Sequence, residues 1–144
     1  MPHISYSELK DWVFCAFYHK LTRVEKLSGF KGNAFTAFGT AVHAVCEKKL
    51  LKEEIEDQEY FIEQFEESLS NIDDDVEIDH DLVSQMKEQS KAILPEIDEA
   101  LTEYFGEFQV LASEMALMET IDGEEEYKFK GFIDAIVVTP DRKV

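Results

Sequence analysis

The sequence has little cysteine, proline and tryptophan, and few basic residues for its acidic content. Its two cysteines, Cys15 and Cys46, are too few for a disulfide framework. The N-terminus shows no basic segment followed by an apolar one, the pattern of a secretory signal. No apolar run approaches the roughly 18–20 residues that span a bilayer. We therefore expect free thiols in a reducing, cytoplasmic compartment and no contact with a membrane.

Acidic charge is what the chain has in excess. It carries 32 Asp and Glu against 14 Lys and Arg, a net charge of −18 over 144 residues. Residues 1–50 hold seven basic and four acidic residues, so the acidic excess lies in residues 51–144. A nucleic acid would be repelled by most of this surface. If the chain binds one, we expect the contact to be made by the first 50 residues, by a metal ion or by something absent from this chain.

Hydrophobic periodicity predicts helices before residue 107 and strands after it. Hydrophobic residues make up 44% of the chain, which is enough for the core of a single domain over residues 1–144. Ser5 and Glu8 have the spacing of a capping box at the start of the first helix. We expect Pro95 to kink or split the last helix. The expected helices cover residues 5–17, 36–52, 53–69 and 82–106, and the expected core includes Phe14, Phe17, Tyr18, Phe35 and Phe38.

The C-terminal part has the pattern of a hairpin. Two strands are expected at residues 108–118 and 127–139, with the Asp122-Gly123 turn signal between them. Helices followed by strands predict an α+β fold, with the N-terminal helices packed on a mixed β-sheet. The second strand is apolar, and such an edge is usually covered. We therefore expect the natural product to continue beyond Val144, or a partner to complete the sheet.

Three residues have the chemistry of metal ligands. Asp134 interrupts an apolar strand, and a buried carboxylate must be paired, protonated or metal-bound. Pairing with a core His or Lys, or capping a kink at Gly131, would also satisfy it. On a regular strand Glu114 shares a face with Ala112 and Ala116, which leaves room for a polar pocket; the alternative is a solvent-facing Glu.

His43 is the third of these residues, and the pattern places it beside the apolar face of its helix. A lone histidine is commonly structural, so its case depends on Glu114 and Asp134. One histidine and two carboxylates, without a cysteine pair, suit Mg²⁺ or Mn²⁺ better than zinc. A second, weaker pattern is a set of cations that could contact phosphates, namely Lys10, Lys20, Arg23 and Lys31.

Several short motifs occur in an order that resembles a known family. Ile4–Leu9 and Cys15–Tyr18 resemble the "S-x-S-x-L…C-P-x-x-Y" opening of RecB-like nucleases. Gly39–His43 resembles their "G-x-x-x-H" helix. Glu114 and Gly131–Asp134 resemble the carboxylates of the first two core strands, the second written "G-x-x-D". The chain thus resembles the N-terminal portion of a PD-(D/E)xK nuclease domain, in the RecB-like branch that includes phage and CRISPR-associated exonucleases.

This resemblance implies a Mg²⁺- or Mn²⁺-dependent DNA exonuclease with a restriction-endonuclease-like fold, acting in a prokaryotic or phage-infected cytoplasm. It implies that His43, Glu114 and Asp134 bind the metal. The family's D/E-x-K lysine has no counterpart within a strand after Asp134, because Asp141-Arg142-Lys143 is expected in a turn. Cys15 matches one cysteine of the iron–sulfur relatives, but no cluster is expected from it alone. The alternative is an inactive nuclease fold that serves as an acidic interaction module.

Overall fold

The computed structural model describes residues 2–27 and 29–141, and the contacts within the chain divide it into two compact units. The first, which we call the hairpin unit, comprises the residues up to Phe30 together with Leu111–Ile136. The second, which we call the helical unit, comprises Lys31–Val110 together with the residues from Val137 onward. No helix within the described ranges is both long and apolar enough to cross a membrane.

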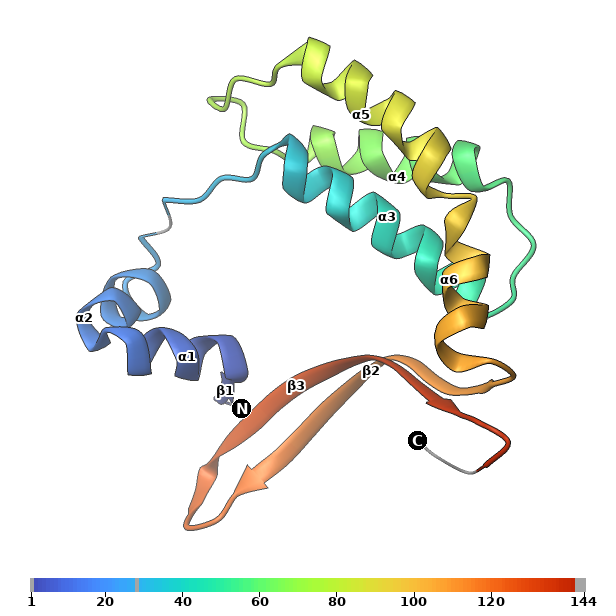
Figure 1. Cartoon of the computed structure of the whole chain (residues 1–144). Helices are drawn as coiled ribbons and strands as arrows, with labels where there is room; N and C mark the ends of the chain where they lie inside the picture. Colours follow the sequence, from blue (N-terminus) through green and yellow to red (C-terminus); the bar gives the residue numbers. More distant parts are fainter. Residues whose placement is uncertain (1, 28, 142–144) are drawn as a thin grey trace. The chain divides into compact units, whose positions relative to one another are not determined.

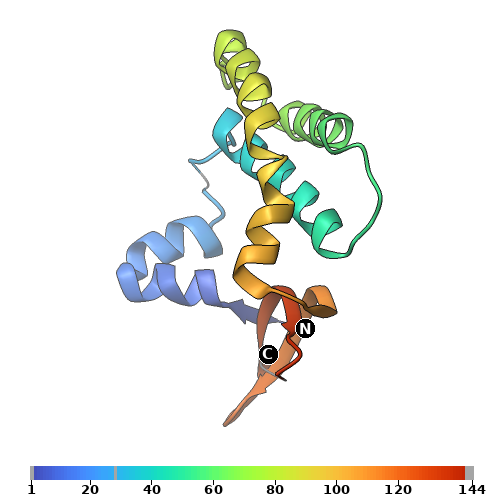
Figure 2. The ribbon, with the colours of Figure 1, turned by 45° about the vertical axis from the view of Figure 1, so that its right-hand side comes forward.

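The described residues of the helical unit form four α-helices. α3 packs against the three that follow it, and α5 contacts both α4 and α6. Figure 1 shows α3, α4 and α5 side by side, and Figure 2 shows α6 following α5 from a second direction. The bounds are α3 (Ala34–Leu50), α4 (Asp57–Ser70), α5 (His80–Ile93) and α6 (Glu96–Phe105).

Caps and breakers set the ends of these helices. The side chain of Asn33 accepts a hydrogen bond from the Thr36 amide at 2.9 Å, and the Thr36 hydroxyl accepts one from the Asn33 amide at 3.2 Å. This reciprocal cap starts α3 two residues before the expected Thr36. Lys52, just after the end of α3, has a φ of 57°, and residues 53–56 are not helical. α4 therefore starts at Asp57 and not at the expected residue 53. Pro95 splits the expected helix over residues 82–106 into α5 and α6.

The core of the helical unit pairs small residues on α3 with large ones on α4. Ala37 and Ala41 are buried on α3, and their small side chains let α4 approach closely enough to bury Phe61 and Phe65 completely. Phe38 contacts both rings edge-on, at centroid distances of 5.4 and 5.8 Å. Each fully buried Phe contributes about 1.5–3 kcal/mol relative to an exposed one. Tight packing of these five residues therefore stabilises the α3–α4 pair.

A charged cluster ties three helices of this unit together. The ammonium of Lys49 on α3 lies 2.7 Å from a carboxylate oxygen of Asp57 on α4 and 2.7 Å from one of Asp98 on α6. The hydrogen bond to Asp57, followed by the one to Asp98, raises the pKa of Lys49 above its ordinary value. Lys49 therefore stays charged and links helix ends that are distant in sequence.

The hairpin unit begins with a short strand and three short helical segments. They are β1 (His3–Ser5), α1 (Tyr6–Phe14), α2 (Ala16–His19) and the π-helix η1 (Lys20–Val24). Ser5 caps α1 as expected, accepting from the Glu8 amide at 3.2 Å. The Glu8 carboxylate lies 3.0 Å from the ring of His19. The prediction of a single helix over residues 5–17 was wrong, because the backbone at Cys15 is extended, with a φ of −163°, and separates α1 from α2.

Three strands form a mixed sheet in the order β1-β3-β2. β2 (Gln109–Ile121) and β3 (Glu124–Val138) are longer than the expected 108–118 and 127–139, because the turn contains only Asp122 and Gly123. Gly123 has a φ of 83°, in the left-handed region that glycine adopts without strain. β1 runs parallel to β3 with Ile4 opposite Phe129. The α+β prediction is confirmed, although the pattern gave no sign of β1.

No described residue of the hairpin unit is buried. The expectation that Phe14, Phe17 and Tyr18 belong to the core was therefore wrong; they are 83%, 65% and 46% exposed. Phe35 on α3 is also exposed, while Phe38 packs against the core as expected. Periodicity on a short helix shows which residues share a face, but it does not show what covers that face.

Candidate metal site on the hairpin

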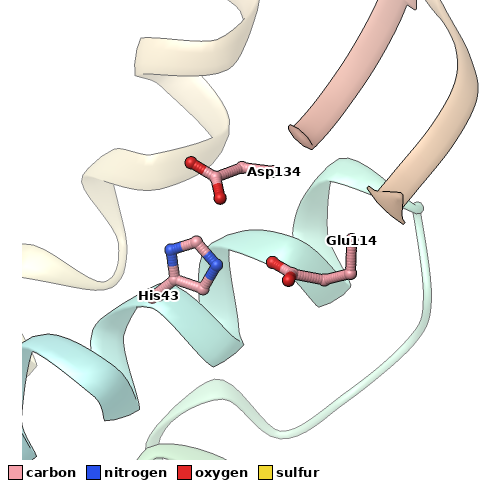
Figure 3. A group of neighbouring side chains, drawn as sticks. All are labelled: His43, Glu114 and Asp134. Carbon is pink, nitrogen blue, oxygen red and sulfur yellow. The ribbon is translucent and has the colours of Figure 1, made fainter. Parts of the chain in front are cut away.

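Two acidic side chains meet on the β2–β3 hairpin. Glu114 comes from β2 and Asp134 from β3, and a carboxylate oxygen of one lies within 4.8 Å of a carboxylate oxygen of the other. Figure 3 shows both carboxylates turned toward the same space. Both side chains are exposed, so a cation could reach them from solvent. The two residues are twenty positions apart in the sequence, and the hairpin brings them together.

The surroundings of the two carboxylates differ from the sequence expectation. Asp134 was expected inside an apolar strand face, but its side chain is exposed. Glu114 was expected to share a face with Ala112 and Ala116; Ala112 is half-buried, whereas Glu114 and Ala116 are exposed. The argument from burial therefore fails for Asp134. The functional case for both residues is their mutual proximity.

The donor set suits a hard divalent cation. Mg²⁺ binds oxygen at about 2.0–2.1 Å, so two oxygens on opposite sides of one ion lie roughly 4 Å apart. The Glu114 and Asp134 oxygens lie within 4.8 Å of each other, so both are within reach of one ion. Two carboxylates without a metal also repel each other, and a divalent cation removes this repulsion. The pair therefore fits the oxygen half of a Mg²⁺ or Mn²⁺ site.

His43 lies on α3 in the helical unit. It was expected beside the apolar face of that helix, but its side chain is exposed. It follows the fully buried Ala41 by two residues, a rotation of about 200° around the helix axis. His43 therefore lies nearly opposite the buried stripe, where an imidazole is accessible to a ligand. The structure places Glu114 and Asp134 on one hairpin and His43 on a helix of the other unit.

Comparison with known families gives these residues a context. A family model for the PD-(D/E)XK nuclease superfamily matches residues 3–144, which is almost the whole chain. The chain belongs to this superfamily. No curated protein and no solved structure matched the chain. The membership assigns a nuclease-type, hydrolytic function and a nucleic-acid substrate, and nucleases of this superfamily generally use divalent metals.

Two of the cations expected to contact phosphates form ion pairs within the N-terminal segment. Arg23 lies 2.6 Å from a carboxylate oxygen of Asp11, and its Nε donates to the same carboxylate. Lys20 lies 3.4 Å from Glu25. A paired cation attracts a phosphate less than a free one does, because the neighbouring carboxylate repels the phosphate.

The other two cations differ from each other. Lys31 forms ion pairs with Asp75 and, at 3.9 Å, with Asp73. These pairs link Lys31 to the acidic segment between α4 and α5. Lys10 is exposed on α1. Of the four cations that the sequence singled out, Lys10 is the one without an ion pair to another described residue.

The lysine motif that names the superfamily has one matching spelling after β3, Asp141-Arg142-Lys143. Asp141 follows Pro140 in a turn, as expected, and its carboxylate accepts a hydrogen bond from the Thr139 hydroxyl. Arg142 and Lys143 lie outside the described residues. The part of the chain that the structure describes therefore contains the carboxylate pair but no D/E-x-K sequence on a strand after β3.

Sequence reasoning found both carboxylates but missed the backbone that holds one of them. Glu114 has a φ of 48°, in the left-handed region that glycine and asparagine favour. Glutamate has no preference for this conformation, so the residue type at position 114 gave no sign of it. The only available sign was indirect, in the interruption of an apolar strand by one acidic residue.

Proposed function

We propose that this chain belongs to the RecB-like branch of the superfamily and forms a single nuclease domain, a Mg²⁺- or Mn²⁺-dependent DNA exonuclease. The observation that carries the proposal is the Glu114–Asp134 pair, with oxygens within 4.8 Å, in a member of a nuclease superfamily. The ordered motifs of the sequence support the RecB-like branch and DNA as the substrate. The same motifs support a prokaryotic or phage origin and a cytoplasmic location.

In this proposal Glu114 and Asp134 supply the oxygen ligands of the metal, and His43 supplies a neutral imidazole. The exposed positions of all three side chains suit binding from solvent. A bound divalent ion would supply Lewis-acid activation of a water and stabilise the leaving oxygen. Asp134 and Glu114 would fix the position of the scissile phosphate indirectly, because their geometry decides where the cation sits. Lys10 would contact the DNA backbone outside the metal site.

Metal binding is the first test, measured with Mn²⁺ as the probe. A ligand present at 100 times its dissociation constant stabilises the folded state by about 2.7 kcal/mol. We expect Mn²⁺ to raise the melting temperature of the unmodified chain. The shift should be lost in Asp134→Asn and Glu114→Gln, and reduced in His43→Ala.

The matched control is Glu119→Gln, which removes an exposed carboxylate from the same strand β2. It should keep the full Mn²⁺-induced shift. An equal shift in Asp134→Asn and in the control would contradict the metal assignment. A shift in His43→Ala equal to that of the unmodified chain would remove His43 from the ligand set while leaving the carboxylate pair.

Exonuclease activity requires its own assay of the intact protein, with end-labelled linear DNA and closed circular DNA of the same sequence. Release of the end label from linear DNA, with the circle intact, is the expected result. Cleavage of the circle would identify an endonuclease and overturn the exonuclease proposal.

The net charge of −18 favours one alternative, an inactive nuclease fold that binds a basic partner through its acidic surface. The pairing of Lys20, Arg23 and Lys31 with carboxylates also weakens the basic surface that DNA requires. This alternative predicts no Mn²⁺-induced shift and no release of label from either DNA.

A further inference from the structure

The backbone of β2 is irregular at the residue that carries one of the two carboxylates. Antiparallel strands have φ near about −140°. Glu114 has a φ of 48° in the middle of β2, which spans Gln109–Ile121. The other described non-glycine residues with positive φ, Lys26 and Lys52, lie outside strands. Glu114 is therefore the one left-handed non-glycine residue within the described strands.

The exposure of the neighbouring residues changes at the same place. Along a regular strand one side chain faces the sheet's packed side and the next faces away. Here Ala112 and Ser113 are both half-buried, and Glu114, Met115 and Ala116 are all exposed. Loss of this alternation next to a left-handed residue is typical of a β-bulge, which bends the strand and redirects a side chain.

We propose that the Ser113–Glu114 step is a β-bulge that acts as a positioning device, directing the Glu114 carboxylate toward Asp134. Glycine is the usual residue at the left-handed position of such a bulge, because it adopts positive φ without strain. This chain has glutamate there, with an oxygen within 4.8 Å of an oxygen of Asp134. The bulge therefore strains the backbone of Glu114 at the position where it brings the carboxylate close to Asp134. The backbone strain at Glu114 does not depend on the proposed function. The role of the bulge in placing a metal ligand does rest on the proposed function.

The strain is tested first, in EDTA, so that metal binding plays no part. Glu114→Asn and Glu114→Gln both remove the charge, but asparagine tolerates the left-handed region and glutamine does not favour it. We expect the Asn variant to melt about 2–4 °C higher than the Gln variant. For the same reason Glu114→Gly should melt higher than Glu114→Ala.

The matched control is position 119 of the same strand, which is exposed and has no positive φ. There the order should reverse, because Gly and Asn are disfavoured at a regular strand position. Glu119→Gly should therefore melt below Glu119→Ala, and Glu119→Asn below Glu119→Gln. The same order of variants at both positions would overturn the bulge.

The positioning is tested by moving the carboxylate while keeping a bulge. In the double variant Glu114→Gly, Met115→Glu and in the double variant Glu114→Gly, Ser113→Glu, glycine keeps the left-handed position and a neighbour carries the acid. We expect both to bind Mn²⁺ about tenfold more weakly than the unmodified chain, or worse, by isothermal titration. Affinity equal to that of the unmodified chain in either one would overturn the positioning. If the unmodified chain binds no Mn²⁺, the proposed metal function fails, while the melting order at position 114 still decides the bulge.

Discussion

The two units of this chain differ most in what they bury. Every residue that is buried in the described ranges belongs to the helical unit, whereas the hairpin unit buries none. The hairpin unit nevertheless carries both carboxylates of the candidate site. Hydrophobic burial is the largest favourable contribution to folding, so the helical unit is expected to be the more stable. Stability and candidate chemistry therefore reside in different segments of one chain.

The hairpin unit depends on directional contacts where the helical unit depends on packing. Its segments are linked by the Ser5 cap, the Arg23–Asp11 and His19–Glu8 pairs, and the pairing of β1 with β3. Such contacts each contribute about 1 kcal/mol, less than one buried aromatic ring. The unit should therefore open locally more often than the helical unit, which hydrogen exchange measures directly.

The largest predicted effect would break the comparison by removing the core of the helical unit. Phe61→Ala deletes a fully buried ring that contacts Phe38 and Phe65, and should lower the free energy of unfolding by about 3–5 kcal/mol. Far-ultraviolet circular dichroism reports mainly on helices, while the single tryptophan, Trp12, reports on α1 of the hairpin unit.

The circular dichroism signal and the Trp12 signal should both be followed during unfolding in urea. The control is Phe35→Ala, which removes an exposed ring from α3 and should change the free energy of unfolding by less than about 1 kcal/mol. Equal losses in the two Phe variants would contradict the assignment of the core to the α3–α4 contact.

A smaller effect concerns the segment that leads into α3. Gly32 has a φ of 88°, and an added Cβ would lie 3.3 Å from Cγ1 of Ile72. Gly32→Ala should therefore cost about 1–2 kcal/mol, from backbone strain and crowding. At Gly29 a Cβ would meet nothing within 4 Å, so Gly29→Ala should be neutral or slightly stabilising. Thermal melts of the pair measure this difference, and an equal loss at both glycines would refute it.

The charged cluster gives a pH-dependent prediction of similar size. Lys49→Met removes the ammonium partner of one carboxylate oxygen of Asp57. The other oxygen is already buried without a hydrogen bond to any described residue, so the carboxylate would lose its remaining partner. The free energy of unfolding should fall by about 1–2 kcal/mol at neutral pH. The folded-state pKa of Lys49 is raised, so its contribution is complete below the unfolded value of 10.5 and is lost as pH rises through the folded value.

The difference between Lys49→Met and the unmodified chain should consequently be constant from pH 7 to about 10 and should shrink at higher pH. Lys48→Met is the control, because Lys48 forms its ion pair with the exposed Glu53 and not with residues of two other helices. A difference that grows above pH 10 would show that Lys49 does not stabilise the fold through its charge.

The smallest predicted effect sharpens the comparison on the side of the hairpin unit. Ser5→Ala removes the side chain that accepts a hydrogen bond from the Glu8 amide, and should cost about 1 kcal/mol. Hydrogen exchange should accelerate in α1 but not in α3. Asn33→Ala should do the reverse, because Asn33 caps α3. Faster exchange in both helices with either variant would mean that the two units open together.

Local signals in the sequence predicted most helix ends and the hairpin. Ser5 as a cap, Pro95 as a break and Asp122-Gly123 as a turn were all read correctly, because each acts within a few residues. The choice of Glu114 and Asp134 also came from a local pattern, a carboxylate within an apolar run. That these two side chains meet was not predictable from either strand alone.

The errors came from features that depend on distant parts of the chain. β1 exists because Ile4 pairs with Phe129, more than a hundred residues later, and three residues are too few to show a period of two. Phe35 and Phe38 are equally apolar and three residues apart, yet only Phe38 reaches the rings of α4. The left-handed backbone at Glu114 had no signal in the residue type.

The sequence by itself determined the four helices of the helical unit, the two strands of the hairpin, the acidic net charge and the choice of candidate metal ligands. These properties follow from composition, capping and periodicity, which act over a single turn or a single hairpin. Only the tertiary structure decided which aromatic rings are buried, where β1 pairs and how Glu114 reaches Asp134. Those outcomes are set by packing and pairing between segments far apart in the chain, where many arrangements satisfy the same local pattern and the total burial and hydrogen bonding select one.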